Sequence, residues 1–455
     1  MISNRIYRDV EAADSRLLSP EGLISIRNLA GLTLVAYLCQ VTLFGPIRYL
    51  LFLTHLQMLW YIPDILGLMC LGTLLLKDAP TNPRILIFVT AISLYLAEGY
   101  IVSGSANSVL STFKALVPLF CGLLLDRRLL THPLMKAIFF LLLMIAVAGV
   151  AYSIVGKMPW SDIQFEGVGV TQQFKGMQWV SGGDVRGFGF GGDEHGAASS
   201  IVSLLIFLSF GLRWRTFYFC ATVASVGVFL TTSRTNLLCL FVYVTLWTVF
   251  DLRRKVSEQP LLNWGLWISF FAVLMPLAVI GIALSYTVDS VPRPLLSLWY
   301  RGTTIFVAPF ELMDRLAPFA TISGFGLGGF GFGLLQSDLA QYFTTVDNFI
   351  LFNYFTFGIP YLVFYFYQCR RMLMENDSFK VAIYIMTAIY GVTLRGWSDY
   401  LFMILVGYSM SVVFRDSPTN VTKSVAHKMH AYRLQRRAYA TPLRSLGHNR
   451  RNWQA

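Results

Sequence analysis

The hydrophobic pattern of the chain is a series of long apolar runs, each close to the ~20 residues that an α-helix needs to cross a bilayer. The runs cover residues 25–45, 50–76, 85–103, 108–125, 135–155, 196–212, 215–232, 235–251, 262–285, 346–368, 379–394 and 397–414. This pattern predicts about twelve transmembrane helices in one all-α bundle. Two long stretches without such a run, residues 156–194 and 286–345, interrupt the series.

The composition agrees with a polytopic membrane protein. Of the 455 residues, 55% are hydrophobic and only 13% are charged, which excludes a soluble domain with an ordinary polar surface. Met1 to Arg27 is polar and charged, so we expect the first span itself to direct insertion. We predict a cytoplasmic segment 1–24, a transmembrane domain 25–414 and a basic cytoplasmic tail 415–455.

Lys and Arg in the short loops predict the orientation, because cytoplasmic loops collect these residues. Counting alternate loops from a cytoplasmic N-terminus places every basic cluster on one side. The clusters are Lys77 and Arg84; Arg127, Arg128 and Lys136; Arg213 and Arg215; Arg253, Arg254 and Lys255; and Arg370, Arg371 and Lys380. Both termini are therefore predicted to be cytoplasmic, and both long interruptions face outward. We expect these outer loops to contribute short helices over a cavity between the spans.

The tail beyond Arg415 accounts for much of the net charge of +12. Basic tails also bind nucleic acid, but beside a membrane we expect attraction to anionic lipid and no nucleic-acid partner. The six cysteines lie within or at the ends of the apolar runs, so we interpret them as small packing residues. No convincing Asp-x-Asp metal motif is evident, and we expect no metal ion or cofactor.

Four arginines depart from the charge bias by falling on the outer side: Arg186, Arg234, Arg301 and Arg395. A single outward arginine is explained by snorkelling to the lipid head groups. Four near one membrane face favour anion binding, since the planar guanidinium contacts phosphate and carboxylate oxygens in pairs.

The first outer loop ends in a glycine-rich segment that runs directly into an apolar run. Asp193 and Glu194 fall at the expected N-terminus of the helix that follows, where capping alone would explain acidic residues. Glu194 and His195, close in sequence to Arg186, also form a candidate proton acceptor beside an anion site.

The second outer loop contains Trp299, Tyr300 and Arg301, then a run of glycines interleaved with Phe and Leu over residues 324–333. A nucleotide-binding loop is not supported, because no Gly-Lys-Ser/Thr motif and no βαβ pattern accompany these glycines. We expect the run to pack at the membrane interface or to let a lipid phosphate or sugar chain approach closely. Asp347 and Asn348 follow at the start of the next span.

The ordered set of these motifs resembles the O-antigen ligase and polymerase superfamily of bacterial surface-polysaccharide assembly. The resemblance extends over most of the chain and rests on four features. They are the Arg186 to Gly196 segment entering a middle span, the Ser233 and Arg234 pair opening a later span, Arg301 upstream of the Gly324 to Gly329 turn, and the Asp347 and Asn348 pair with Gly358 about ten residues on.

This resemblance implies a GT-C-like bundle in the bacterial inner membrane and a metal-independent glycosyltransferase acting outside it. The implied substrates are sugars linked to undecaprenyl pyrophosphate, and a chain-length regulator is a candidate partner. Family ligases usually carry His where this sequence has Asp347, which favours a polymerase. A ligase that transfers glycan to a lipid A-core acceptor is the alternative.

The residues themselves are consistent with this chemistry. Departure of a diphosphate requires its developing charge to be neutralised, a role suited to Arg186, Arg234 and Arg301. The acceptor hydroxyl requires a base, for which Asp347 and Glu194 are candidates, with His195 next. Further candidate substrate contacts are Arg395, Tyr300 and Asn348. Tyr300, Trp299 and the phenylalanines of the glycine run could stack on sugar rings, although interfacial anchoring explains them equally well.

A flippase for lipid-linked sugars is a second alternative. Such a carrier should place charges within several spans and contain two related halves. The middle positions of the spans are nearly uncharged and no internal repeat is evident by eye, so the sequence favours a one-sided enzyme.

Overall fold

The fold was analysed in a computed structural model. It describes residues 26–414 except 157, 161–163, 168–169, 174–179, 182–183, 253–258, 272–273, 288–289, 293–294, 345, 376, 394–396 and 398. The chain divides into a unit up to Val413 and a second unit from Phe414 to the end. The predicted N-terminal segment 1–24 and the basic tail 415–455 lie outside the described residues.

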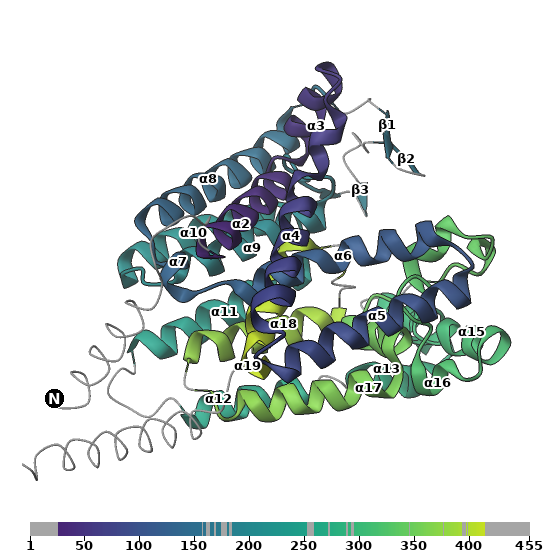
Figure 1. The fold of residues 1–455 in the computed structure, drawn as a ribbon. Coiled ribbons are helices and arrows are strands. Elements are labelled where there is room, and N and C mark those ends of the chain that lie inside the picture. The colour runs from purple at the N-terminus through teal and green to yellow at the C-terminus, as the bar shows by residue number, and fades with distance from the viewer. Residues whose placement is uncertain are drawn as a thin grey trace, which may run out of the picture. The chain divides into compact units, whose positions relative to one another are not determined.

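Helices occupy the apolar runs (Figure 1). The bundle helices are α2 (Ile26–Thr42), α3 (Phe44–Leu53), η1 (Gln57–Tyr61), α4 (Ile62–Thr73), η2 (Leu74–Asp78), α5 (Pro83–Ser103), α6 (Ala106–Leu124), α7 (Arg127–Leu130), α8 (Pro133–Val155), α9 (Glu194–Ser209), α10 (Trp214–Leu230), α11 (Arg234–Leu252), α12 (Gln259–Phe271), α13 (Met275–Leu284), α17 (Phe349–Met372), α18 (Ser378–Thr393) and α19 (Tyr400–Phe414). Local signals define several ends: Asn82 caps α5 ahead of Pro83, and Gly104 ends it with φ of 63°.

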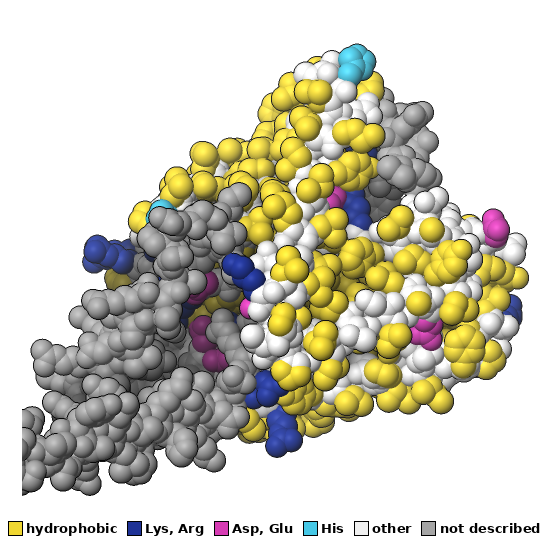
Figure 2. Space-filling view, in the orientation of Figure 1, with side chains coloured by type: hydrophobic (Ala, Val, Ile, Leu, Met, Phe, Trp, Pro, Cys, Tyr) yellow, Lys and Arg dark blue, Asp and Glu magenta, His cyan; other side chains and the backbone are white. Residues whose placement is uncertain are grey.

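Among the described residues, five helices are long and apolar enough to cross a membrane, and up to seven spans result if each of two bent pairs is one span. The pairs are α2 with α3, bent by 89°, and α12 with α13, bent by 42°. Five further apolar helices have 10–17 residues. Only 17% of the apolar window of α5 is buried, and Figure 2 shows hydrophobic side chains spread over the surface of the helices. Such a surface is suited to lipid and supports a helical membrane protein.

The first long interruption differs from the prediction, whereas the second agrees with it. The first contains two antiparallel hairpins, β1 (Gln164–Gly167) with β2 (Val170–Gln173) and β3 (Val180–Ser181) with β4 (Asp184–Val185), where we predicted short helices. The second contains the expected short helices: α14 (Leu296–Tyr300), η6 (Arg301–Ile305), α15 (Ala308–Leu316), α16 (Ala320–Ser323), η7 (Gly331–Gln336) and η8 (Ala340–Tyr342). The frequent glycines and β-branched residues of the first loop favour strands over helix.

The glycine run 324–333 packs inside the protein, against α5, α6 and a break in α17. The break is at Gly358, whose φ of 63° is left-handed, and Pro360 follows it. Because proline has no N–H, the carbonyl of Thr356 loses its helical donor, and the N–H of Gly326 donates to it at 3.0 Å. Phe325 N–H donates to the Phe355 carbonyl at 2.8 Å. The loop therefore satisfies the polar backbone of a broken helix, as a membrane requires.

This packing corrects the expectation of sugar stacking for Phe325 and Phe330 of the glycine run, whereas Phe332 is 48% exposed. Phe325 is fully buried and Phe330 is 1% exposed, and their rings stack with centroids 5.8 Å apart, so neither presents a face to a sugar. The glycines are needed for close backbone packing. A methyl group on Gly326 would overlap the backbone of Gly99 in α5, and one on Gly328 would meet the backbone of Val109 in α6.

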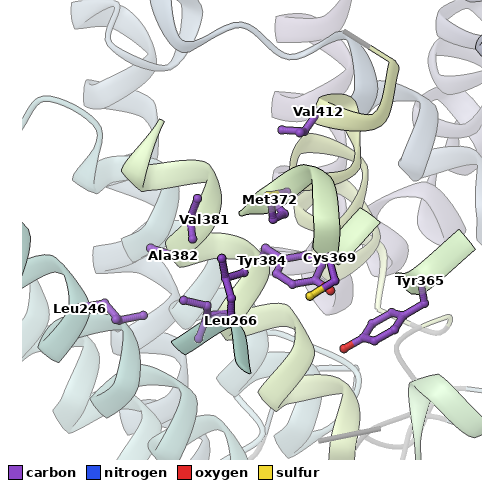
Figure 3. Close-up of a cluster of buried hydrophobic side chains, with 10 residues drawn as sticks. Leu246, Leu266, Tyr365, Cys369, Met372, Val381, Ala382, Tyr384 and Val412 are labelled. Carbon is purple, nitrogen blue, oxygen red and sulfur yellow. The ribbon is translucent and has the colours of Figure 1, made fainter. Parts of the chain in front are cut away.

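A hydrophobic core joins the C-terminal helices (Figure 3). Its buried members are Leu246, Leu266, Tyr365, Cys369, Met372, Val381, Ala382, Tyr384, Ile385 and Val412. The Tyr365 hydroxyl donates to the Ser269 carbonyl at 2.9 Å, so this ring ties α17 to α12.

Three basic side chains donate hydrogen bonds to acceptors in the last turn of α19. Arg371 donates to the Val412 carbonyl, Arg84 donates to the Val413 carbonyl, and buried Lys380 donates to Ser411 Oγ at 2.6 Å. Cations at a helix C-terminus offset its partial negative charge. Residues that the sequence marks as orientation signals thus also stabilise the end of a helix.

Candidate functional site

The start of α9 brings the first set of predicted residues together. Asp193 caps the helix by accepting from the Gly196 N–H at 2.5 Å, so capping explains this carboxylate. Glu194 instead faces Arg186, with Oε1 3.4 Å from Nη1. The side chains of Arg186 and Glu194 remain 26% and 18% exposed. This ion pair therefore lies at the edge of the folded protein, where a polar ligand can compete for it.

The turn between α10 and α11 lies beside the start of α9. His195 Nδ1 lies 3.3 Å from Ser233 Oγ, and this oxygen also accepts from Asn236 Nδ2 at 2.9 Å. Thr232, with φ of 55°, ends α10 in a left-handed conformation that β-branched residues avoid. Arg234 follows as the exposed first residue of α11. Backbone strain of this kind is concentrated at functional sites.

A second pair joins the second outer loop to α17. Arg301 opens the π-helical turn η6, and its Nε lies 4.0 Å from Oδ2 of Asp347. The cap of α17 is Asn348, whose Oδ1 accepts from the Leu351 N–H at 2.8 Å. Helix capping therefore does not account for Asp347, which strengthens its candidacy for a chemical role.

Asn348 itself departs from the prediction of a substrate contact. It is fully buried, and its amide also donates to the Val392 carbonyl at 2.8 Å. With both ends of the side chain bonded to backbone, Asn348 is a structural residue. Tyr300 is 54% exposed beside Arg301 and remains a candidate contact, whereas Arg395 lies outside the described residues.

The start of α19 contributes polar residues that the sequence analysis did not single out. Asp399 accepts from the Tyr390 hydroxyl at 2.9 Å and from the Phe402 N–H at 3.0 Å. Asp399 therefore caps the start of α19 and joins it to α18.

An ion pair between α4 and α6 was also missed. Lys114 Nζ lies 3.3 Å from Oδ2 of Asp64, and the Tyr37 hydroxyl donates to Oδ1 of Asp64 at 3.1 Å. Our expectation of nearly uncharged spans is therefore wrong for two predicted spans, 50–76 and 108–125. Each charge was visible as a single ionisable residue in an apolar run, which is itself a signal of function. The partner was not visible, because the residues are 50 positions apart in sequence.

Comparison with protein-family models and with curated proteins finds no match to the chain. The structure brings Arg186, Glu194, His195 and Ser233 into one cluster, and it pairs Arg301 with Asp347. Each group combines a guanidinium with a carboxylate, so each can bind an anion and accept a proton.

Proposed function

We propose that this protein is a membrane glycosyltransferase that polymerises undecaprenyl-pyrophosphate-linked oligosaccharide repeat units. One observation carries the proposal: predicted arginines lie beside predicted acids at two places, Arg186 beside Glu194 at the start of α9 and Arg301 beside Asp347 just before α17. In this proposal the twelve apolar segments are twelve spans of the bacterial inner membrane. The termini are cytoplasmic, and the site opens on the outer side.

The geometry supports a simple transfer step. An acceptor hydroxyl attacks the anomeric carbon of the donor sugar, the bond between that carbon and the diphosphate oxygen breaks, and the diphosphate leaves with the electron pair. Arg301 and Arg234 stabilise the charge that develops on the diphosphate. A guanidinium has five N–H donors, so contact with one carboxylate leaves others for phosphate oxygens.

The proton of the acceptor hydroxyl passes to a carboxylate. Asp347 is our first candidate because Asn348 already supplies the helix cap. Glu194 is the second candidate, held by Arg186. His195 contacts Ser233 and can orient that side of the site.

Reconstitution tests the proposal. The purified protein is placed in lipid vesicles with undecaprenyl-pyrophosphate-linked repeat units, and lipid-linked products are resolved by gel and mass analysis. We expect a ladder of repeat-unit multiples that disappears in Arg301→Ala and persists in Arg215→Ala, a cytoplasmic-loop control. If chains never lengthen, the polymerase proposal is wrong. Transfer to an added lipid A-core acceptor would then indicate a ligase.

The ion pair between Asp64 and Lys114 favours one other candidate, a carrier for lipid-linked sugars, because charges within spans are typical of transport pathways. The same vesicles distinguish the two. A carrier moves unreacted substrate between leaflets without joining repeat units, whereas a polymerase lengthens chains without changing substrate sidedness.

A further inference from the structure

The Lys114 ammonium lies among polar groups from several helices, and none of the ion pairs of Arg186 and Arg301 includes it. Its side chain is 32% exposed, whereas that of its partner Asp64 is only 9% exposed. Lys114 Nζ also lies 4.5 Å from the centre of the Tyr61 ring, on η1. The carboxylate is thus enclosed by protein, and the ammonium is the member of the pair that a ligand can reach.

A second cation belongs to the same group. The Arg48 guanidinium, on α3, lies 5.5 Å from the Phe44 ring centre and 5.3 Å from that of Trp60. Trp60 and Tyr61 are consecutive residues of η1, so Arg48 and Lys114 contact neighbouring rings. Tyr400, at the start of α19, packs against Tyr37 with ring centroids 5.5 Å apart, and the Tyr37 hydroxyl donates to Asp64. The named groups therefore carry two positive charges and one negative charge. We call Arg48, Lys114, Asp64, Tyr61 and Tyr400 the α3/α6 cluster.

The surroundings of the α3/α6 cluster are suited to a lipid. The 89° bend after α2 turns α3 across the direction of α2. Large apolar side chains on α3 and the segment after it are exposed: Leu50, Phe52, Leu53, Leu56, Met58, Leu59 and Ile62. Figure 2 shows a hollow beside the arm that carries α3, with basic and acidic side chains at its base. A cation pair bordered by exposed apolar surface matches a charged head group with hydrocarbon chains.

The helix α3, which carries Arg48 of the α3/α6 cluster, also contacts the segment between the paired residues Arg186 and Glu194. Gly45 N–H donates to the Phe190 carbonyl at 2.8 Å, which joins the first turn of α3 to the loop between Arg186 and Glu194. Trp160 packs between them, with its ring centroid 6.0 Å from that of Phe190 and 6.5 Å from that of Tyr49. Arg48 therefore belongs to a helix that contacts the segment between Arg186 and Glu194.

We propose that Arg48 and Lys114 bind the diphosphate of a second lipid-linked substrate, the acceptor repeat unit. This inference rests on the proposed function. A polymerase that joins two lipid-linked chains handles two diphosphates at once: one leaves the donor, and the other stays on the acceptor. Arg234 and Arg301 serve the first, and the α3/α6 cluster holds the second so that its sugar reaches the base.

Native mass spectrometry of the whole protein in detergent, with undecaprenyl diphosphate as the probe, tests this assignment without relying on activity. We expect two bound molecules in the wild type and one in Arg48→Met/Lys114→Met. Arg215→Met is the matched control, because its guanidinium also lies over an aromatic ring, 5.2 Å from that of Trp214. Arg215→Met should retain two bound molecules of undecaprenyl diphosphate.

Two further variants separate binding from folding. Asp64→Asn/Lys114→Met removes the whole ion pair, so a merely structural role of Lys114 predicts that the second molecule binds again. Recovery of that binding would overturn the proposal. Arg234→Ala/Arg301→Ala should lose the other molecule and keep the one on the α3/α6 cluster.

Competition between two lipids tests whether the α3/α6 cluster selects undecaprenyl diphosphate or binds any anionic lipid. If phosphatidylglycerol occupies the second position as well as undecaprenyl diphosphate does, the cluster is a general anionic-lipid site and the acceptor assignment is wrong. A wild type that binds one molecule, lost only in Arg234→Ala/Arg301→Ala, contradicts this inference while the proposed function stands. A wild type that binds none contradicts both.

The vesicle assay gives an independent measure. Arg48→Met/Lys114→Met should raise the KM for the lipid-linked acceptor at least about tenfold, as expected for loss of a charge-assisted contact. The rate with a lipid-free repeat-unit glycan as acceptor should stay at the wild-type value. An equal loss with both acceptors would show damage to the transfer site and refute the assignment.

Discussion

The variant Asp347→Asn distinguishes a chemical role of this carboxylate from a structural one, because the two roles predict different losses of thermal stability and of turnover. At 4.0 Å from Arg301 Nε, a unit charge pair is worth about 4 kcal/mol at an effective dielectric constant near 20. The two side chains are 24% and 34% exposed, and solvent screening reduces such pairs to about 1 kcal/mol or less. Asp347→Asn should therefore lower thermal stability only slightly. Loss of a general base, by contrast, slows turnover about 10²–10⁴-fold.

The assay pairs thermal unfolding in detergent with initial polymerisation rates in vesicles. Asp314→Asn, in α15 of the same outer loop, is the matched control and should leave both quantities near the wild-type values. We expect Asp347→Asn to change the rate far more than the stability, with the KM for lipid-linked substrate nearly unchanged. A rate within about twofold of wild type would refute the base assignment. A rate that falls only as far as the folded fraction falls would assign Asp347 a structural role.

Three further predictions concern stability and are measured as the thermal unfolding of the purified protein. Gly326→Ala should destabilise by about 2–5 kcal/mol, because φ is 74° and the new methyl group would overlap backbone of α5; Gly72→Ala, with open space around it, should be close to neutral. Thr232→Gly should stabilise by about 1 kcal/mol, since glycine relieves the left-handed strain at φ 55°; a loss of stability would show that the threonine side chain matters more than the strain. Ser411→Ala should cost about 1–3 kcal/mol by removing the 2.6 Å hydrogen bond from buried Lys380, and an unchanged melting temperature would contradict this.

Much of the helical framework was predictable because it depends on local properties of the chain. The apolar run 85–103 became α5 at Pro83–Ser103, and the run 135–155 became α8 at Pro133–Val155. Proline at the first position and a capping side chain before it define both starts. The second run, 50–76, was less well delimited: the structure ends α3 at Leu53 and resumes with η1 at Gln57. Hydropathy alone does not reveal this break or the 89° bend between α2 and α3, which falls within the first run, 25–45.

The candidate site was predictable in part. Arginines that the charge bias predicts to lie on the outer side stood out in the sequence, and two of them, Arg186 and Arg301, meet acids that the sequence had also marked. Asn348 was assigned wrongly, because its position beside Asp347 does not reveal that its amide caps α17. The roles of Asp399 and Lys114 depend on partners in other helices.

By itself, the sequence determined the class of the protein, the positions of its helices and the residues with unusual charge, since composition, hydropathy and capping act over a few neighbouring residues. Only the tertiary structure decided which of these residues meet. The contact of His195 with Ser233 and the pairing of Asp64 with Lys114 join residues 38 and 50 positions apart. The glycine run acquired its role in the same way, by supplying N–H groups to carbonyls that Gly358 and Pro360 leave without helical donors. Such contacts arise from the packing of whole helices, which no short stretch of sequence encodes.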